Sequence, residues 1–437
     1  MNKFSLKCIV LLSFVFFICS GLIAQILTLD SAIAIMMKKN YNIQMAKTNS
    51  QIAANNYSPG MAGMLPSVSV TAGYSDANNN IHQQYSTGTE ITRNGATSKV
   101  LTPGVGLNWT LFDGTRMFIA YEQLGLLRDE GIMNVKSAVQ VNIASVIEAY
   151  YNIVQQKKLL AVIDSTIALY KKEMDIAKQQ YQIGTSTKLN YLQAEVGYNA
   201  QRSAYLRQQV NVTNATVTLN QLIALPVETS YLVSDSIPIR RGMVYDSLKK
   251  NMLAQNPDIK ISQMNMKVAA NNTRIVNALR LPTLSLGLNY GLSRTENSAG
   301  LTLLNQTQGL TGGLTLGWTL YNGNIVNIQK KNALLTEMNA KFQSDLVETQ
   351  TNAVLLEAYQ QYNSNLNILK MDEENLLVAK EAVDVALGQF RVGTGNIVQL
   401  EQAQASYQTA GSLVVTDRYN SKLSETQLLQ QSGLLVK

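Results

Sequence analysis

Four short segments alternate apolar and polar residues with a period of two, which is the pattern of a β-strand with one apolar face. These segments are 67–74, 104–112, 284–292 and 313–320. Leu, Val, Trp and Tyr occupy one face, and the other face carries mainly Gly, Ser, Thr and Asn with almost no charge. Such a polar face is typical of a water-filled barrel interior, although a soluble antiparallel sheet with one buried face gives the same alternation.

Large aromatic residues lie toward the ends of these segments. We expect four of them to contact the membrane interface, namely Tyr74, Trp109, Tyr290 and Trp318, because Trp and Tyr concentrate at the level of the lipid head groups. Four strands cannot close a barrel, since the smallest outer-membrane barrels have about eight. The strands therefore form either an open soluble sheet or a barrel that several chains share in outer membrane lipid, and three chains would supply twelve strands.

Two long stretches of the chain favour helices. The seven prolines leave residues 104–225 and everything after 282 free of the strongest helix breaker. We predict helices over 116–182 and 324–391, each a rod of roughly 100 Å at about 1.5 Å per residue. Such rods need partners along their length, and shorter helices are predicted at 29–57, 188–223, 245–278 and 397–431.

The apolar residues of both rods follow the spacing of a left-handed coiled coil. From Leu160 to Tyr181 they recur at alternating steps of three and four. The second rod repeats the stripe from Leu369 to Phe390, with Asp372 as its one break.

The two halves of the chain carry the same motifs in the same order. Trp-Thr-Leu-Phe-Asp-Gly at 109–114 returns as Trp-Thr-Leu-Tyr-Asn-Gly at 318–323, an offset of 209 positions, and Leu65-Pro66 returns as Leu281-Pro282 with an offset of 216. A repeat of this length indicates one duplicated fold rather than a solenoid. We therefore predict a first repeat at 25–225, an inter-repeat strap at 226–242 and a second repeat at 243–437.

The N-terminus and the composition exclude several classes of protein. Residues 1–24 have the basic start and short apolar run of a signal peptide. Cys8 and Cys19 both lie within it, so we expect no disulfide in the mature chain. The formal charge of +7 falls to +5 without Lys3 and Lys7, and the basic residues are scattered, which argues against nucleic acid as a partner.

Neither a membrane-spanning helix nor an enzyme is predicted. After the signal peptide no run of about 18 apolar residues occurs, so the chain could enter a membrane only as strands of a closed barrel. The single histidine, His82, lies in a loop-like stretch. We see no catalytic set, metal-ligand cluster or phosphate loop, and we expect no cofactor.

Taken together, these motifs resemble those of the TolC-type outer membrane efflux proteins over essentially the whole mature length of the chain. The resemblance rests on residues 27–32 (LTLDSA), the Leu-Pro strand entries, the repeated Trp-Thr-Leu motif, and the paired motifs at 181–194 (YQIGTSTKLNYLQA) and 390–403 (FRVGTGNIVQLEQA). It implies a mixed α and β membrane protein: a homotrimer that shares a twelve-stranded barrel and continues as a helical periplasmic tunnel. It also implies a passive conduit of a tripartite efflux or type I secretion system, working with a periplasmic adaptor and an inner-membrane pump.

The resemblance also assigns residues to sites. Tips that dock the adaptor would comprise Gly184, Thr185, Leu189, Gly393, Thr394 and Val398. The periplasmic aperture would be formed by Asn190, Gln193, Phe390, Gly395, Gln399 and Gln402. In well-known members a Tyr and an Arg of the second repeat bond to an Asp of the first, but the matching positions here are Phe390, Gly395 and Asn190. We therefore expect closure by apolar packing, with three copies of Phe390 meeting near the axis and its ring in a helix seam.

One further class of protein fits the long heptad helices. A trimeric coiled-coil surface protein, such as an adhesin without transport activity, is the alternative to a channel. The aromatic residues at the strand ends and the tandem repeat argue against it.

Overall fold

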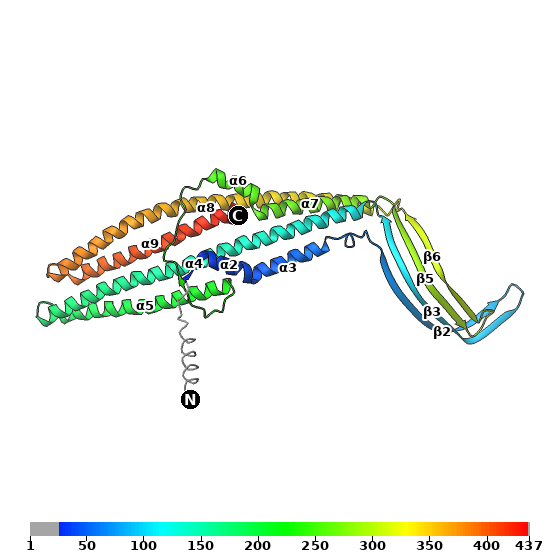
Figure 1. Ribbon diagram of the computed structural model, residues 1–437, viewed down its shortest axis with the longest axis horizontal. Helices are drawn as coiled ribbons and strands as arrows, with labels where there is room; N and C mark the ends of the chain where they lie inside the picture. Colours follow the sequence, from blue (N-terminus) through cyan, green and yellow to red (C-terminus); the bar gives the residue numbers. More distant parts are fainter. Residues whose placement is uncertain (1–25, 436–437) are drawn as a thin grey trace, which may run out of the picture. The chain divides into compact units, whose positions relative to one another are not determined.

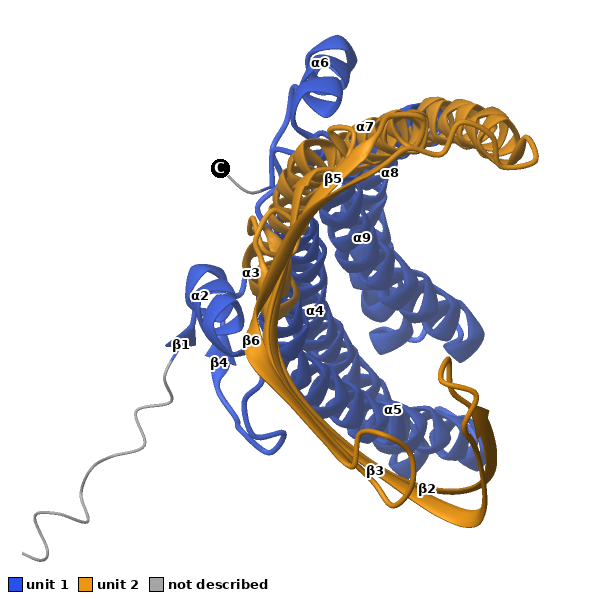
Figure 2. Ribbon diagram, turned by 90° about the vertical axis from the view of Figure 1, so that its right-hand side faces the viewer, with its two compact units in different colours: residues 1–47, 134–259, 348–437 blue, residues 48–133, 260–347 orange. Residues whose placement is uncertain are grey.

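The computed structural model describes residues 26–435, so the predicted signal peptide lies outside the described residues. The chain divides into two compact units, drawn in blue and orange in Figure 2. Unit 1 contains residues up to 47 together with 134–259 and those from 348 onward. Unit 2 contains residues 48–133 and 260–347. Within the described range, no helix is both long enough and apolar enough to cross a membrane.

The sheet of unit 2 contains four antiparallel strands in the order β2-β3-β5-β6 (Figure 1). Their bounds are β2 Ser67–Gln84, β3 Glu90–Phe112, β5 Thr283–Asn297 and β6 Leu304–Gly317. The four predicted strands are thus confirmed, and each extends beyond its alternating segment at one or both ends. His82 lies in β2, with its ring beside Thr92 of β3, so its expected position in a loop was wrong.

The last strand ends earlier than predicted. Its final ladder pair joins Gly317 to Thr283, and the residue before Thr283 is Pro282, which has no N–H to donate to a further pair. Trp318 therefore leaves the sheet, and its indole N–H donates instead to the backbone carbonyl of Arg280 at 3.0 Å.

The long helices are α4 (Arg116–Gln182) and α8 (Ile325–Arg391), each of 67 residues, as the proline-free stretches predicted. Two 35-residue helices follow them, α5 (Lys188–Leu222) and α9 (Ile397–Gln431). Figure 1 shows α5 beside α4 and α9 beside α8. Each pair is a helical hairpin, and we call α4–α5 the first hairpin and α8–α9 the second hairpin.

The two helices expected before the strands are each broken in two. The first becomes α2 (Leu29–Lys39) and α3 (Tyr41–Asn56), and the second becomes α6 (Tyr245–Gln255) and α7 (Pro257–Ala278). An asparagine in extended conformation separates each pair, Asn40 in the first and Asn256 in the second.

Both asparagines make the same set of contacts. Their side-chain amides donate to the last turns of α5 and α9, from Asn40 to Leu222 O at 2.8 Å and from Asn256 to Gln431 O at 2.9 Å. Their side-chain oxygens accept backbone N–H groups from the first turn of the next helix. Each break is therefore a capped corner that satisfies the orphan amides of the new helix.

The main core of unit 1 encloses Tyr150 of α4. Its hydroxyl donates to Leu27 O at 2.9 Å and accepts the N–H of Ser234 at 3.1 Å. Leu27 belongs to β1 (Ile26–Leu27), which forms a short parallel ladder with β4 (Leu232–Val233), and Ser234 directly follows β4. One buried phenol thus fixes part of the 226–242 segment to the N-terminal strand, a pairing that the sequence pattern did not predict.

Candidate functional site: the hairpin tips

The two hairpins of unit 1 turn in the same way. Gly184 and Gly393 both adopt a left-handed φ of 78°, a conformation that costs glycine little and other residues more. The threonine that follows each glycine closes the turn: Thr185 N donates to Gln180 O at 2.9 Å and Thr394 N donates to Gln389 O at 3.0 Å. Both threonine hydroxyls donate to the same carbonyls. The expected Gly-Thr turns are present at both positions.

The surfaces of both turns are apolar and exposed. Four side chains, Ile183 and Leu189 at the first turn and Val392 and Val398 at the second, are between 63% and 73% exposed. A Cβ added to either turn glycine would meet no atom within 4 Å. We call residues 183–189 the first tip and 392–398 the second tip. Sequence reasoning missed Ile183 and Val392, although the apolar residue before each turn glycine was visible in both motifs.

Two of the predicted aperture amides, Asn190 and Gln399, take part in helix caps. Thr187 caps α5 by accepting Asn190 N, and the side chain of Asn190 donates to Ser186 at 3.0 Å. In the second hairpin, Asn396 and Gln399 form a reciprocal capping box. Gln193, Gln399 and Gln402 are exposed.

Phe390 lies inside the second hairpin's end, where it is only 3% exposed. It packs in a cluster with Ala177 of α4, Ala194 of α5, and Ile397 and Leu400 of α9. Gln180 of α4 donates to the carbonyl of Phe390 at 3.0 Å. Its expected position in a helix seam is confirmed. The expectation that three copies of the ring meet near an axis was wrong, because its own chain already covers it.

Gly395 lies close to the end of α8 in the second tip. A Cβ at this position would lie 3.0 Å from Gln389 Cβ and 3.2 Å from Phe390 N. A Cβ here would be closer than an ordinary contact, so its neighbours would have to shift by a few tenths of an ångström to admit one. The first tip has Ser186 at the equivalent position, with the same backbone bond.

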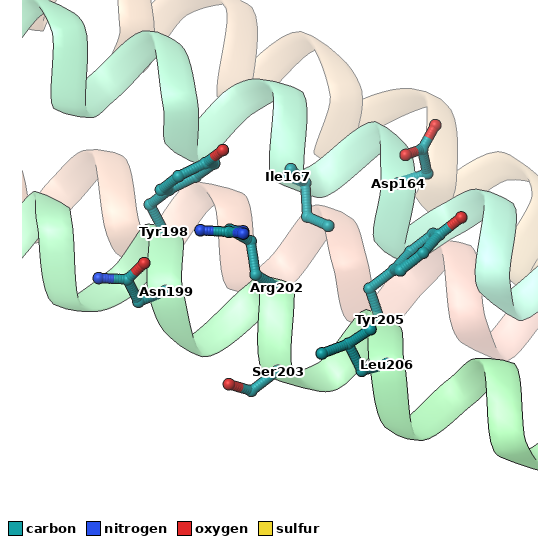
Figure 3. Close-up of a pocket in the computed structure, with 8 residues that line it drawn as sticks. All are labelled: Asp164, Ile167, Tyr198, Asn199, Arg202, Ser203, Tyr205 and Leu206. Atoms are coloured by element: carbon teal, nitrogen blue, oxygen red, sulfur yellow. The ribbon is translucent and has the colours of Figure 1, made fainter.

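A groove of about 490 Å³ lies along the first hairpin (Figure 3). Tyr198 and Tyr205 of α5 stand seven residues apart on one helix face, and Arg202 lies between them with its guanidinium 5.7 Å from the Tyr198 ring. Asp164 and Ile167 of α4 complete the wall. Arrangements of this kind suit protein contacts, because aromatic and Arg side chains are enriched at interfaces.

The four expected interface aromatics are exposed in unit 2. Trp109 and Trp318 make equivalent hydrogen bonds, from their indole N–H groups to Met64 O at 2.9 Å and to Arg280 O at 3.0 Å. The hydroxyl of Tyr290 accepts from Gln308 at 2.8 Å. Each indole thus has its polar edge satisfied and its ring free to contact another surface. No group of three or more His, Cys, Asp or Glu in the described part of the chain could hold a metal ion.

Comparisons of the sequence and of the structure with known proteins find the same family. The sequence profile of the family described as outer membrane efflux protein matches residues 33–225 and 248–434. The outer membrane protein TolC of Escherichia coli (strain K12) is 20% identical over 358 residues, which cover 78% of this chain and 71% of TolC. The outer membrane efflux protein BepC of Brucella suis is 21% identical over 76% of this chain and 72% of its own length.

The fold matches solved structures of the same kind. The outer membrane protein VceC of Vibrio cholerae superposes with a TM-score of 0.74 at 15% identity, covering 93% of this chain and 96% of VceC. The chain therefore belongs to the outer membrane efflux protein family and is an outer membrane protein whose helical part lies in the periplasm.

Proposed function

We propose that the chain is the passive outer membrane channel of a tripartite efflux or type I secretion system, assembled as a homotrimer. Two observations carry the proposal: the pair of matching exposed apolar tips in unit 1, and the sheet in unit 2, whose two outer strands each have one edge without a ladder partner in the described chain. Each feature calls for a different protein contact, and we assign the chain no catalytic role.

The unpaired edges of the sheet require strands from further copies of the chain. Its outer strands β2 and β6 each pair with one neighbour, which leaves one edge of each without a ladder partner in the described chain. In hydrocarbon every unpaired backbone group costs several kcal/mol. Pairing β6 of one copy with β2 of the next removes both edges, and three copies then close twelve strands.

The faces of the sheet support the same assembly. Val68, Val70, Leu310, Leu314 and Leu316 are all largely exposed on the outer strands. Their alternation with Ser, Thr and Gly fits a lipid-facing outer surface and a polar lumen.

A helix face of unit 2 is also uncovered in the single chain. It is an apolar stripe on the first part of α8, formed by Ile328, Leu335, Met338, Phe342 and Leu346, all exposed. An apolar stripe of this length is a candidate interface, and we assign it to the neighbouring copy.

We assign the tips to a periplasmic adaptor that connects the channel to an inner-membrane pump. Ile183 with Leu189 and Val392 with Val398 form two similar apolar patches, so an adaptor could contact six similar sites on a trimer. We further propose that residues 25–225 and 243–437 are two structural repeats joined by a strap at 226–242. Equivalent contacts at Asn40 and Asn256 support this division.

Purification in mild detergent tests the assembly. We expect outer-membrane extraction only with detergent, a heat-labile trimer by light scattering, and ion conduction after reconstitution into planar bilayers. A monodisperse monomer that still conducts would contradict the shared barrel. A trimer that is released without detergent and does not conduct would favour the adhesin-like alternative.

A further inference from the structure

A buried acid lies between the two hairpins of unit 1. Glu173 of α4 is fully buried, and Gln404 of α9, which is also fully buried, faces it. Neither carboxylate oxygen of Glu173 nor either side-chain polar atom of Gln404 has a hydrogen-bond partner of normal geometry. Buried polar groups are nearly always paired, so an exception of this kind is informative.

No basic side chain in the described part of the chain compensates the charge of Glu173. Among the ion pairs of residues 26–435, none involves Glu173. The nearby titratable groups are Glu401 of α9 and the phenol of Tyr170 on α4, which packs toward Gly197 of α5. Burial raises the pKa of Glu173 to about 7, Gln404 opposes this shift, and the charge of Glu401 adds to it.

The position of Glu173 makes its charge relevant to the tips. Further along the same seam, Val162 of α4 faces Gly411 of α9. Ala177, four residues after Glu173, lies in the cluster that contains Phe390. Glu173 therefore lies where the first hairpin packs against the second, about one helical turn from the packing that holds their ends together. The equivalent position in the second hairpin is Ala382, so only one of the two hairpins carries this acid.

We propose that Glu173 is a proton-controlled latch between the two hairpins of each chain. When protonated, it is a neutral acid that can donate its O–H to the amide oxygen of Gln404, and the seam stays closed. When the proton passes to solvent water, an uncompensated carboxylate remains in a dry seam, and the hairpins separate until water reaches it. The consequence for transport rests on the proposed channel function, but the separation itself does not.

The direction of the pH effect follows from proton linkage. The closed seam binds the proton more tightly than a solvated glutamate, so closing is favoured at acidic pH. It becomes less favoured as pH rises toward 7 and levels off above that value. Within this window the ratio of separated to closed hairpins should rise by up to about tenfold per pH unit.

Spin-label distance measurements test the latch without requiring channel activity. Labels on Leu189→Cys and Val398→Cys report on the two exposed tips, and Cys8 and Cys19 lie within the predicted signal peptide. We expect the distance distribution of the detergent-solubilised protein to shift toward longer values between pH 5 and pH 8. Glu173→Gln should abolish the shift and keep the acid distribution, and Glu381→Gln, an exposed acid on α8, should leave it as in the parent.

A second variant covers the case in which Glu173→Gln does not assemble. Gln404→Lys supplies a counter-ion to the carboxylate, so the tips should stay close at every pH. A parent protein without a pH-dependent shift, or either variant with the full parental shift, would overturn the latch. Bilayer recordings of the parent at fixed pH test the proposed function separately. Conduction without a distance shift would refute the latch and keep the channel function. A distance shift without conduction would refute the channel function and keep the latch.

Discussion

Replacing Phe390 by alanine should loosen the ends of the two hairpins. The side chain is almost completely buried, and two of its cluster neighbours, Ala177 and Ala194, belong to the first hairpin. Truncating a buried Phe to Ala typically costs about 3–5 kcal/mol, through lost transfer free energy and the cavity left behind. If about half of that loss falls on contacts between the hairpins, the population of separated tips should rise by roughly tenfold or more.

Trypsin can measure this population directly. Arg391 follows Phe390 and is exposed, but it lies at the end of α8, and cleavage after it requires local opening. When opening and closing are fast, cleavage rate follows the equilibrium population of the open form. We expect cleavage after Arg391 to accelerate about tenfold or more in Phe390→Ala, and cleavage after Lys188 at the first tip provides a reference on the same chain. Single-channel conductance of the isolated trimer should rise in parallel.

Val398→Ala is the matched control, because it removes an exposed apolar side chain from the same tip. Exposed substitutions of this kind usually change stability by less than about 0.5 kcal/mol. Equal cleavage rates and equal conductance in Phe390→Ala and Val398→Ala would refute the reasoning, and would place the closing contacts higher in the paired helices.

Three further substitutions test other parts of the argument. Gly184→Glu and Gly393→Glu place a charge and a strained residue on the apolar tips. Export in cells should therefore be lost while trimer yield is unchanged. The control Gly388→Ala, within α8, should retain export. Tyr150→Phe removes the hydroxyl that joins Leu27 and Ser234. This should lower the free energy of unfolding by about 1–3 kcal/mol and lower the thermal dissociation temperature of the trimer. Tyr198→Phe, in the exposed groove, should change neither. Gln402→Asp should increase cation selectivity, because a carboxylate ring attracts cations more strongly than amides do. The measurement is the reversal potential in a salt gradient. An unchanged reversal potential would show that Gln402 does not line the pore.

Regular elements were predictable where a local pattern determines them. The absence of proline over 116–182 and the polar-apolar alternation of the strands depend only on neighbouring residues. The bounds of α4 match the prediction, and each of the four strands includes most of its predicted segment. The corner at Asn40 was missed because its cause is distant in sequence. Each asparagine is held by a carbonyl about 180 residues away. Asn256 also had a local signal, since Pro257 directly follows it and disfavours a helical conformation at the residue before it.

In the candidate site, too, features set by neighbouring residues were predictable and features set by distant residues were not. The Gly-Thr turns and the seam position of Phe390 follow from the motifs and the heptad spacing. The burial of Phe390 within its own chain does not, because it depends on Ala177 and Ala194 being small enough to admit the ring. The unpaired state of Glu173 was likewise hidden, since its seam partner Gln404 is more than 200 residues away.

A comparison of equivalent positions in the two hairpins distinguishes the features that both tips share from those that occur at one tip only. The turn glycines have the same φ, and the threonines after them make the same bonds, as expected of two tips that present one kind of surface to a partner. Other equivalent positions differ: Tyr181 is 41% exposed where Phe390 is buried, and Ser186 stands where the second hairpin has Gly395. A trimer of such chains would alternate three firmly packed tips with three looser ones. Opening would then require the second hairpin to leave its neighbours, because that hairpin carries the buried ring and faces the acid of the first.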